Sequence, residues 1–176
     1  MTPPTSSVTA SAANSRWWRW LVVSVVIVVA DQFTKALILA AFRPGEQLVV
    51  TSFFSLTLAF NPGAAFSFLA SADGWQRWLF AAIATAASAV ILWLLKRGGS
   101  VLYCLGLALI AGGALGNLWD RLALGTVVDF LLFHYAGWAY PAFNVADSAI
   151  TVGASLLILD SFRAPRTQPG ANDARS

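Results

Sequence analysis

Four long apolar stretches divide the chain, and short polar segments separate them. The stretches cover residues 17–42, 75–95, 101–122 and 140–162. A helix rises about 1.5 Å per residue, so about 20 residues cross the roughly 30 Å hydrocarbon layer of a bilayer. Each stretch is long enough for one crossing. The pattern therefore predicts a mainly α integral membrane protein with four transmembrane helices.

The segment between the first two stretches, residues 43–74, has a different period. In QLVVTSFFSLTLAF (47–60) the even-numbered positions are apolar with the exception of Ser52. These apolar positions are Leu48, Val50, Phe54, Leu56, Leu58 and Phe60. A period of two with many aromatic and β-branched residues is typical of strands, which here would lie at the membrane surface. A plain loop is the alternative.

The first stretch also resembles a secretory signal peptide. Arg16 and Arg19 precede LVVSVVIVVA, as a basic region precedes an apolar core in such peptides. The apolar character resumes with ALILAAF after DQFTK. We therefore prefer an uncleaved spanning helix.

Both ends of the chain differ from the rest. Residues 1–15 and 164–176 are rich in small and polar residues and in proline, a composition that predicts disordered tails. Residues 16–163 between them would form a single four-helix membrane domain.

The composition agrees with a membrane protein. Hydrophobic residues make up 58% of the chain and charged residues 11%, whereas a soluble domain is about one quarter charged. Lipid must therefore cover part of the apolar surface. The net charge of +3 is scattered, which does not indicate a nucleic-acid partner. With one cysteine and one histidine, the chain has neither an internal disulfide nor the ligands of an ordinary zinc site.

Basic residues predict the orientation of the four helices. Pairs of them precede the first stretch, separate the second from the third, and follow the fourth. These pairs are Arg16 and Arg19, Lys96 and Arg97, and Arg163 and Arg166. Cytoplasmic loops are enriched in lysine and arginine, so both termini should be cytoplasmic. Segments 43–74 and 123–139 should then lie outside.

Four aspartates lie in or beside apolar segments: Asp31, Asp120, Asp129 and Asp147. An ionisable residue at the centre of a bilayer costs about 2.5–3.5 kcal/mol, so each needs a partner or a function. Asp31 and Lys35 are four residues apart on one helix face and can pair. A purely structural ion pair is as good an explanation of them as a functional one.

The third stretch carries Asn117, Asp120 and Arg121 on one helix face. The planar guanidinium of Arg121 suits a carboxylate or a phosphate. An aspartate beside an arginine is more often structural, so we interpret Asp120 as a support residue. Before the second stretch, Asn61-Pro62-Gly63 could bring an amide close to a peptide backbone, although such tripeptides also form ordinary turns.

Asp129 and Asp147 should lie at a similar depth near the outer face. Two carboxylates brought close together share a proton, and such a pair can activate water for amide hydrolysis. Two separate helix-capping aspartates are the alternative. Spacing alone does not decide between these interpretations.

Five motifs occur in order along residues 17–162: DQFTK, NPGAAFSF, GGALGNLWDRL, VVDF and FNVADS. Together, on four predicted helices, they resemble the lipoprotein signal peptidase (signal peptidase II) family. This resemblance implies an aspartyl endopeptidase of the bacterial cytoplasmic (inner) membrane with its active site near the outer face. The family removes signal peptides from diacylglyceryl-modified prolipoproteins and cleaves before the lipid-modified cysteine.

The resemblance also implies roles for individual residues. Asp129 and Asp147 would be the catalytic pair. Eight further residues match the motif positions that shape the site and hold the substrate or the pair: Asp31, Lys35, Asn61, Gly63, Asn117, Asp120, Arg121 and Asn144. The family implies an outer β-like cradle between helices 1 and 2, partners limited to prolipoprotein substrates and membrane lipids, and neither cofactor nor metal.

Three other functions remain as alternatives. A serine/lysine protease would use Lys35, but no serine stands in a nucleophile elbow, and Cys104 lacks a nearby base. A small transporter or proton-coupled carrier would place its acids near the membrane midplane. A scaffold or assembly factor would not need the aspartates.

Overall fold

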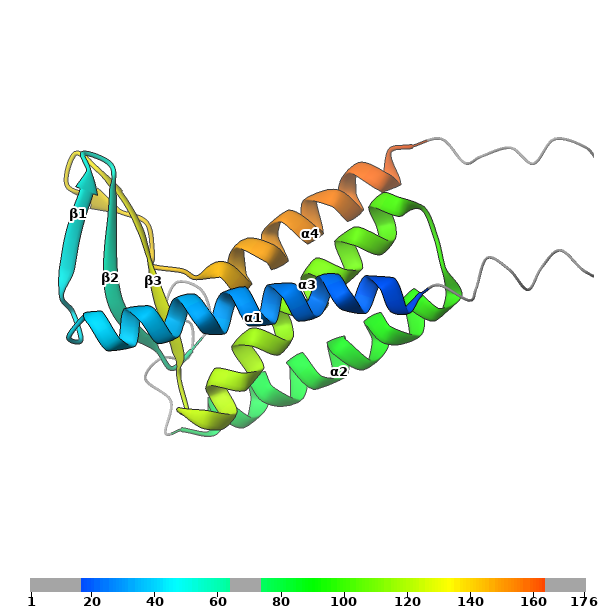
Figure 1. The fold of residues 1–176 in the computed structure, drawn as a ribbon, viewed down its shortest axis with the longest axis horizontal. Helices are drawn as coiled ribbons and strands as arrows, with labels where there is room; N and C mark the ends of the chain where they lie inside the picture. The colour runs from blue at the N-terminus through cyan, green and yellow to red at the C-terminus, as the bar shows by residue number, and fades with distance from the viewer. Residues whose placement is uncertain (1–16, 64–73, 164–176) are drawn as a thin grey trace, which may run out of the picture.

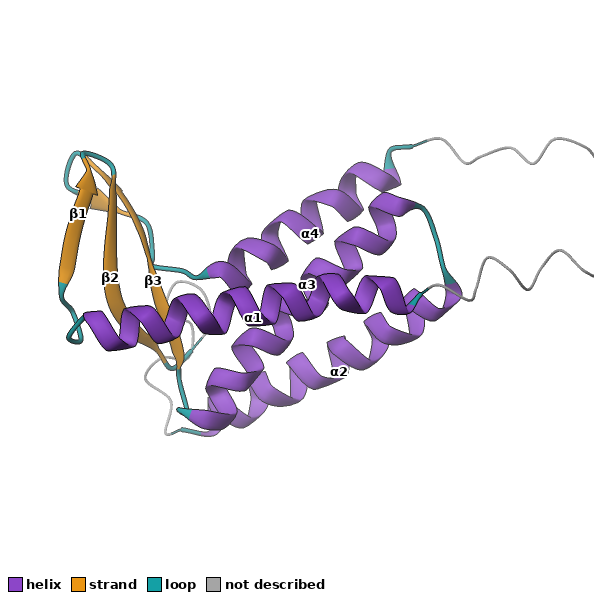
Figure 2. Cartoon of the chain, viewed as in Figure 1, coloured by secondary structure: helices purple, strands orange, loops and turns teal. Residues whose placement is uncertain are grey.

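The computed structural model describes residues 17–63 and 74–163, which form a bundle of helices with a small sheet at one end (Figures 1 and 2). The helices are α1 (Trp18–Ala41), α2 (Trp75–Arg97), α3 (Val101–Ala123) and α4 (Val145–Ser161). The strands are β1 (Gln47–Thr51), β2 (Phe54–Asn61), β3 (Val127–Tyr135) and β4 (Trp138–Ala139). The two predicted tails, 1–15 and 164–176, lie outside the described residues.

Among the described residues, three helices are long and apolar enough to cross a membrane. They are α1, with 24 residues, and α2 and α3, with 23 each. The fourth apolar stretch, predicted over 140–162, is helical only over the 17 residues of α4. The helix starts late because Phe143 forms a bridge with Leu131 of β3, and Asn144 then caps the helix. The structure thus establishes three candidate spans and not the predicted four.

Apolar side chains on the outside of the bundle fit a lipid surrounding. Val25, Val29 and Phe33 of α1 and Val90 and Trp93 of α2 are each more than half exposed. A soluble protein rarely exposes so large a continuous apolar surface. The helices therefore need lipid on these faces.

Helix α3 lies at the centre of the bundle, and its glycines allow its neighbours to come close. A Cβ atom on Gly112 would lie 2.8 Å from the Ser24 carbonyl oxygen of α1. A Cβ on Gly113 would meet the Ala146 carbonyl oxygen of α4 and lie 2.7 Å from Ile150 Cγ1. Small residues at such contacts are a common device for helix association in membranes.

The four strands form one antiparallel sheet in the order β1-β2-β3-β4. The predicted strands within 47–60 are confirmed as the β1–β2 hairpin. The expected cradle between helices 1 and 2 is incomplete, because β3 and β4 from segment 123–139 complete the sheet. Residues Phe54 to Asn61 pair with Phe133 to Val127, a contact between distant segments that no local pattern reveals.

Much of the apolar side of the hairpin is exposed, although Leu58 is buried in the core. Leu48 and Val50 are 54% and 53% exposed, whereas Ser55 and Thr57 are buried. Ser55 Oγ lies 2.7 Å from His134 Nε2, and Thr57 Oγ1 donates to the Glu46 carbonyl oxygen at 2.8 Å. The hairpin therefore presents several apolar side chains to its surroundings, whereas its buried hydroxyl groups have hydrogen-bond partners within the sheet and the segment before it.

The end of the bundle opposite the sheet holds the start of α1, the α2–α3 turn and the end of α4 (Figure 1). Gly98 ends α2 with a φ of +76°, which glycine adopts without strain. Ser100 caps α3, and its hydroxyl donates to Asp160 Oδ1 of α4 at 2.5 Å. This contact joins the turn to α4.

We expect Gly113→Ala to lower the melting temperature of the detergent-solubilised protein. Alanine gains about 1 kcal/mol over glycine in a helix, but overpacking costs about 1–3 kcal/mol, and here the added carbon meets backbone that cannot rotate away. Ala89→Leu on the exposed face of α2 is the control and should leave the melting temperature unchanged. Equal stability of both variants would contradict tight α3–α4 packing.

Candidate active site

A buried group of three charges lies between α1 and α3. Lys35 Nζ is 2.8 Å from Asp31 Oδ2 and 2.7 Å from Asp120 Oδ2. All three residues are at most 2% exposed. The structure thus brings the predicted Asp31–Lys35 pair together and adds Asp120 to it. Buried charges are tolerated only when they are paired and hydrogen-bonded, which this arrangement achieves.

The two carboxylates of this group also bind backbone of other elements. Asp31 Oδ1 accepts from Ala146 N at 2.9 Å, and Asp120 Oδ2 accepts from Val128 N at 3.1 Å. Ala146 lies in the first turn of α4, and Val128 lies in β3. The charged group therefore fixes the starts of both elements relative to α1 and α3.

Sequence reasoning missed Gln32, which belongs to the same group. Its Nε2 donates to Asp120 Oδ1 at 2.8 Å and to the Gly116 carbonyl oxygen at 3.2 Å. The available signal was its position next to Asp31, as a polar residue within an apolar helix. An uncharged amide in an apolar helix can complete a charged network of this kind.

Asp129 and Asp147 meet around a single residue, Asn144. Asn144 Nδ2 donates to Asp129 Oδ1 at 2.8 Å, and Asn144 N donates to Asp147 Oδ2 at 3.3 Å. The Asn144 side chain also accepts from Asp147 N at 2.9 Å, which completes a capping box. Asp147 is therefore part of a helix cap, as the alternative interpretation held, whereas Asp129 lies in a strand.

Two further amides complete the surroundings of these carboxylates. Asn61 Nδ2 donates to Asp129 Oδ2 at 3.1 Å, and Asn117 Nδ2 donates to Asp147 Oδ1 at 2.7 Å. Each of the four carboxylate oxygens thus accepts a hydrogen bond from an N–H group. Such donors orient a carboxylate and favour its ionised form.

The electrostatics of Asp129 differ from those of an ordinary aspartate. Burial raises the pKa of Asp129 to about 7, and the negative charge of Asp147 acts in the same direction. The hydrogen bonds from Asn61 and Asn144 and the charge of Lys35 oppose this rise. Asp129 can therefore gain or lose a proton near neutral pH, as a general acid or base requires.

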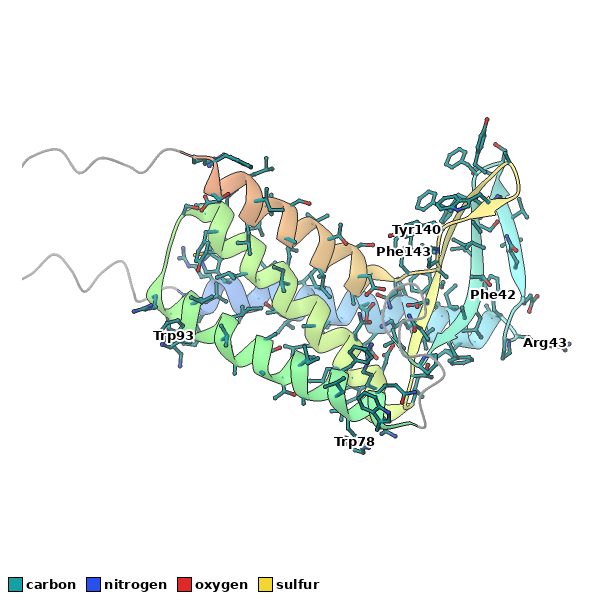
Figure 3. All side chains as sticks on the ribbon, turned by 180° about the vertical axis from the view of Figure 1, so that it is seen from behind. Phe42, Arg43, Trp78, Trp93, Tyr140 and Phe143 are labelled. Carbon is teal, nitrogen blue, oxygen red and sulfur yellow. The ribbon has the colours of Figure 1, made fainter. Side chains whose placement is uncertain are left out.

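Both aspartates line a cavity of about 880 Å³. Its walls are largely apolar and come from α2, α3, α4, β2 and the segment before α4, including Phe80, Ile83, Phe143, Ile150 and Val152. Figure 3 shows Tyr140 and Phe143 between the sheet and the bundle, whereas Trp93 lies at the far end of α2. The carboxylates thus face a space suited to an apolar ligand, at the sheet end of the molecule.

Arg121 faces this cavity and not Asp120, although the two are neighbours in sequence. Its Nη2 donates to the Gly63 carbonyl oxygen at 3.0 Å, and its guanidinium carbon lies 5.1 Å above the Phe80 ring. Its buried Nε has no hydrogen-bond partner among the described residues. Gly63 N in turn donates to Asn61 Oδ1 at 3.0 Å, so Arg121 and Asn61 border one edge of the cavity.

The remaining candidate groups lie elsewhere. Cys104 is buried in the bundle with Ile91, Leu95 and Leu107. Within 17–63 and 74–163, no three His, Cys, Asp or Glu residues are grouped as metal ligands would be.

The chain is similar in sequence to a known protein family and to individual members of it. The family model described as signal peptidase (SPase) II matches residues 23–163. The lipoprotein signal peptidase of Paraburkholderia phytofirmans is 56% identical over 157 residues, which cover 89% of this chain and 91% of that relative. The lipoprotein signal peptidase of Ralstonia nicotianae is 56% identical over 148 residues, which cover 84% and 86%.

The fold of this chain also matches that of a solved structure. A bacterial membrane enzyme determined by the in meso method superposes with a TM-score of 0.75 at 28% sequence identity. The match covers 86% of this chain and 94% of that enzyme. The chain therefore belongs to the signal peptidase II family.

Proposed function

We propose that this protein is an aspartyl endopeptidase of the bacterial inner membrane that removes signal peptides from prolipoproteins. Its substrates would carry a diacylglyceryl group, and cleavage would occur before the lipid-modified cysteine. Membership in the signal peptidase II family supports this function. The single observation that carries the mechanism is that Asn144 holds both Asp129 and Asp147 at the wall of one cavity.

In the proposed reaction, Asp129 and Asp147 share one proton. The ionised carboxylate takes a proton from a water molecule, whose oxygen attacks the scissile carbonyl carbon. The protonated carboxyl group donates a hydrogen bond to the carbonyl oxygen as negative charge develops there. The tetrahedral intermediate then collapses, the C–N bond breaks, and the leaving amine takes a proton from a carboxyl group.

The other matched residues divide into three groups by their contacts. Asn61, Asn117 and Asn144 donate hydrogen bonds to the two carboxylates and would orient them. Arg121 lines the cavity and donates to the Gly63 carbonyl oxygen, and these two residues would hold the peptide backbone of the substrate. The charged group of Asp31, Lys35 and Asp120 would form the frame beneath them.

The position of the acids distinguishes the protease from a proton-coupled carrier. A carrier would place its acids near the midplane. Asp129 and Asp147 instead lie in β3 and the first turn of α4, at the sheet end of the bundle. The comparisons also do not support a transporter.

We further propose that α4 is the fourth crossing and that both termini are cytoplasmic. Residues 16–163 would form the membrane domain between two tails, 1–15 and 164–176. Lys96 and Arg97 lie at the α2–α3 turn, at the opposite end from the sheet (Figure 2). Under the positive-inside rule the sheet and the carboxylates would then be near the outer face.

Cysteine labelling of intact cells tests this orientation. Single cysteines at Glu46 and His134, in a Cys104→Ala background, should react with a membrane-impermeant thiol reagent. A cysteine at Gly99 should react only after the cells are permeabilised. Labelling of position 99 from outside would reverse the orientation and contradict an outer-face site.

Either Asp129→Asn or Asp147→Asn should abolish cleavage of a lipid-modified prolipoprotein by the purified protein. An amide cannot exchange the proton that both catalytic roles require. We expect a loss of several orders of magnitude from each change. The double variant should be little worse, because residues that act as a unit are not additive.

Asp160→Asn is the matched control for these variants. Asp160 is an aspartate of α4 that accepts a hydrogen bond from Ser100 at the opposite end of the bundle. This variant should retain most activity. Near-normal cleavage by either Asp129→Asn or Asp147→Asn, in a folded preparation, would refute the aspartyl mechanism.

Cleavage should also depend on the lipid of the substrate. Each buried CH₂ of an acyl chain contributes up to about 0.8 kcal/mol, so the diacylglyceryl group should strengthen binding substantially. Measured KM should therefore rise sharply when the same precursor lacks the lipid. Equal kcat/KM for the lipidated and unlipidated precursors would exclude this substrate class.

A further inference from the structure

Lys35 determines which way the amide of Asn117 faces. Its Nζ has three N–H groups and three acceptors: Asp31 Oδ2 at 2.8 Å, Asp120 Oδ2 at 2.7 Å and Asn117 Oδ1 at 3.1 Å. An ammonium group can only donate hydrogen bonds. The Asn117 oxygen must therefore face Lys35, which leaves Asn117 Nδ2 to donate to Asp147.

The same constraint reaches Asp129 through Asn144. Asn144 Nδ2 donates to Asn117 Oδ1 at 3.1 Å and to Asp129 Oδ1 at 2.8 Å. If the Asn117 amide were rotated, its NH₂ group would face the donors of Lys35 and Asn144, and its oxygen would face the Asp147 carboxylate. Each of these contacts would be repulsive, and Lys35 is the charged donor among these three partners of the Asn117 amide.

Lys35 also acts through the backbone beneath the two carboxylates. Its partner Asp31 accepts from Ala146 N, and its partner Asp120 accepts from Val128 N. Val128 directly precedes Asp129, and Ala146 directly precedes Asp147. Asp129 and Asp147 thus each follow a residue whose backbone N–H donates to a carboxylate. Lys35 binds both of these carboxylates.

We infer that Lys35 is a positioning residue: its ammonium group sets the direction of the hydrogen bonds to both proposed catalytic carboxylates and secures the backbone that carries them. This inference rests on the proposed function. Lys35 is 2% exposed and does not line the cavity, so it does not act by contact with the substrate. Its positive charge also lowers the pKa of Asp129.

The first test is Lys35→Met in the purified protein, with a lipid-modified prolipoprotein as substrate. We expect kcat to fall about 100-fold, the scale of a misplaced catalytic group, while KM changes little. The pH–rate profile should move to higher pH, because loss of the positive charge raises the pKa of Asp129. Unchanged kcat and an unshifted profile in a folded variant would overturn the inference.

Ser24→Ala is the matched control for a structural effect. Ser24 is a buried polar residue of the same helix, and its hydroxyl donates to the Ala108 carbonyl oxygen of α3 at 2.8 Å. This variant also removes a contact between α1 and α3, but it leaves the charged group intact. It should lower the melting temperature and leave kcat and the pH profile unchanged.

A double-mutant cycle of Lys35→Met with Asn117→Leu tests whether Lys35 acts through the Asn117 amide. Leucine has the branched shape of asparagine but no amide, so this variant interrupts the hydrogen-bond chain while Asp31, Lys35 and Asp120 remain. If Lys35 acts through Asn117, the double variant should lose less kcat than the product of the two single losses. Losses that multiply fully would overturn the inference that Lys35 sets the direction of these hydrogen bonds, because they would leave only its effect through the backbone.

A charge-compensated variant covers the case in which Lys35→Met alone does not fold. The native group carries one net negative charge, and Lys35→Met with Asp120→Asn keeps that charge. We expect this variant to fold and to have a low kcat. Wild-type kcat in this variant would refute positioning by Lys35, whereas failure of the wild-type protein to cleave would refute the proposed function itself.

Discussion

The contact of the Lys35 ammonium group with two buried carboxylates is the constraint on which the rest of the structure depends. Removing an ion from water costs several kcal/mol, so Asp31, Lys35 and Asp120 must stay together. They come from α1 and α3, and the carboxylates also bind backbone N–H groups of α4 and β3. One electrostatic requirement thus holds four elements in a fixed arrangement.

The glycines of α3 make this arrangement sterically possible. A Cβ on Gly116 would lie 2.7 Å from Asp31 Oδ2, and a Cβ on Gly113 would meet the Ala146 carbonyl oxygen. Larger residues at these two positions would push α1 and α4 away from α3. The hydrogen bond from Ala146 N to Asp31 Oδ1 would then break. Close packing and buried charge therefore act at the same place, next to Asp147, where the proposed water-activating pair would need a rigid base.

The sequence by itself determined the features that depend on local pattern. The length of the apolar stretches predicted the three long helices, and the period of two predicted the β1–β2 hairpin. Both signals follow from the geometry of the backbone. The i, i+4 spacing predicted the Asp31–Lys35 pair for the same reason. The catalytic pairing of Asp129 with Asp147 stays a prediction from family resemblance, since spacing favoured it no more than two separate helix caps.

Only the tertiary structure decided the contacts between distant segments. It paired Asp120 with Lys35 and directed Arg121 to the cavity, although adjacent opposite charges suggested a local relationship. It added β3 to the sheet, brought Gln32 into the charged group and placed Asn144 between both aspartates. Periodicity describes which face of an element is polar, but the partner of a buried polar group depends on how helices and strands pack.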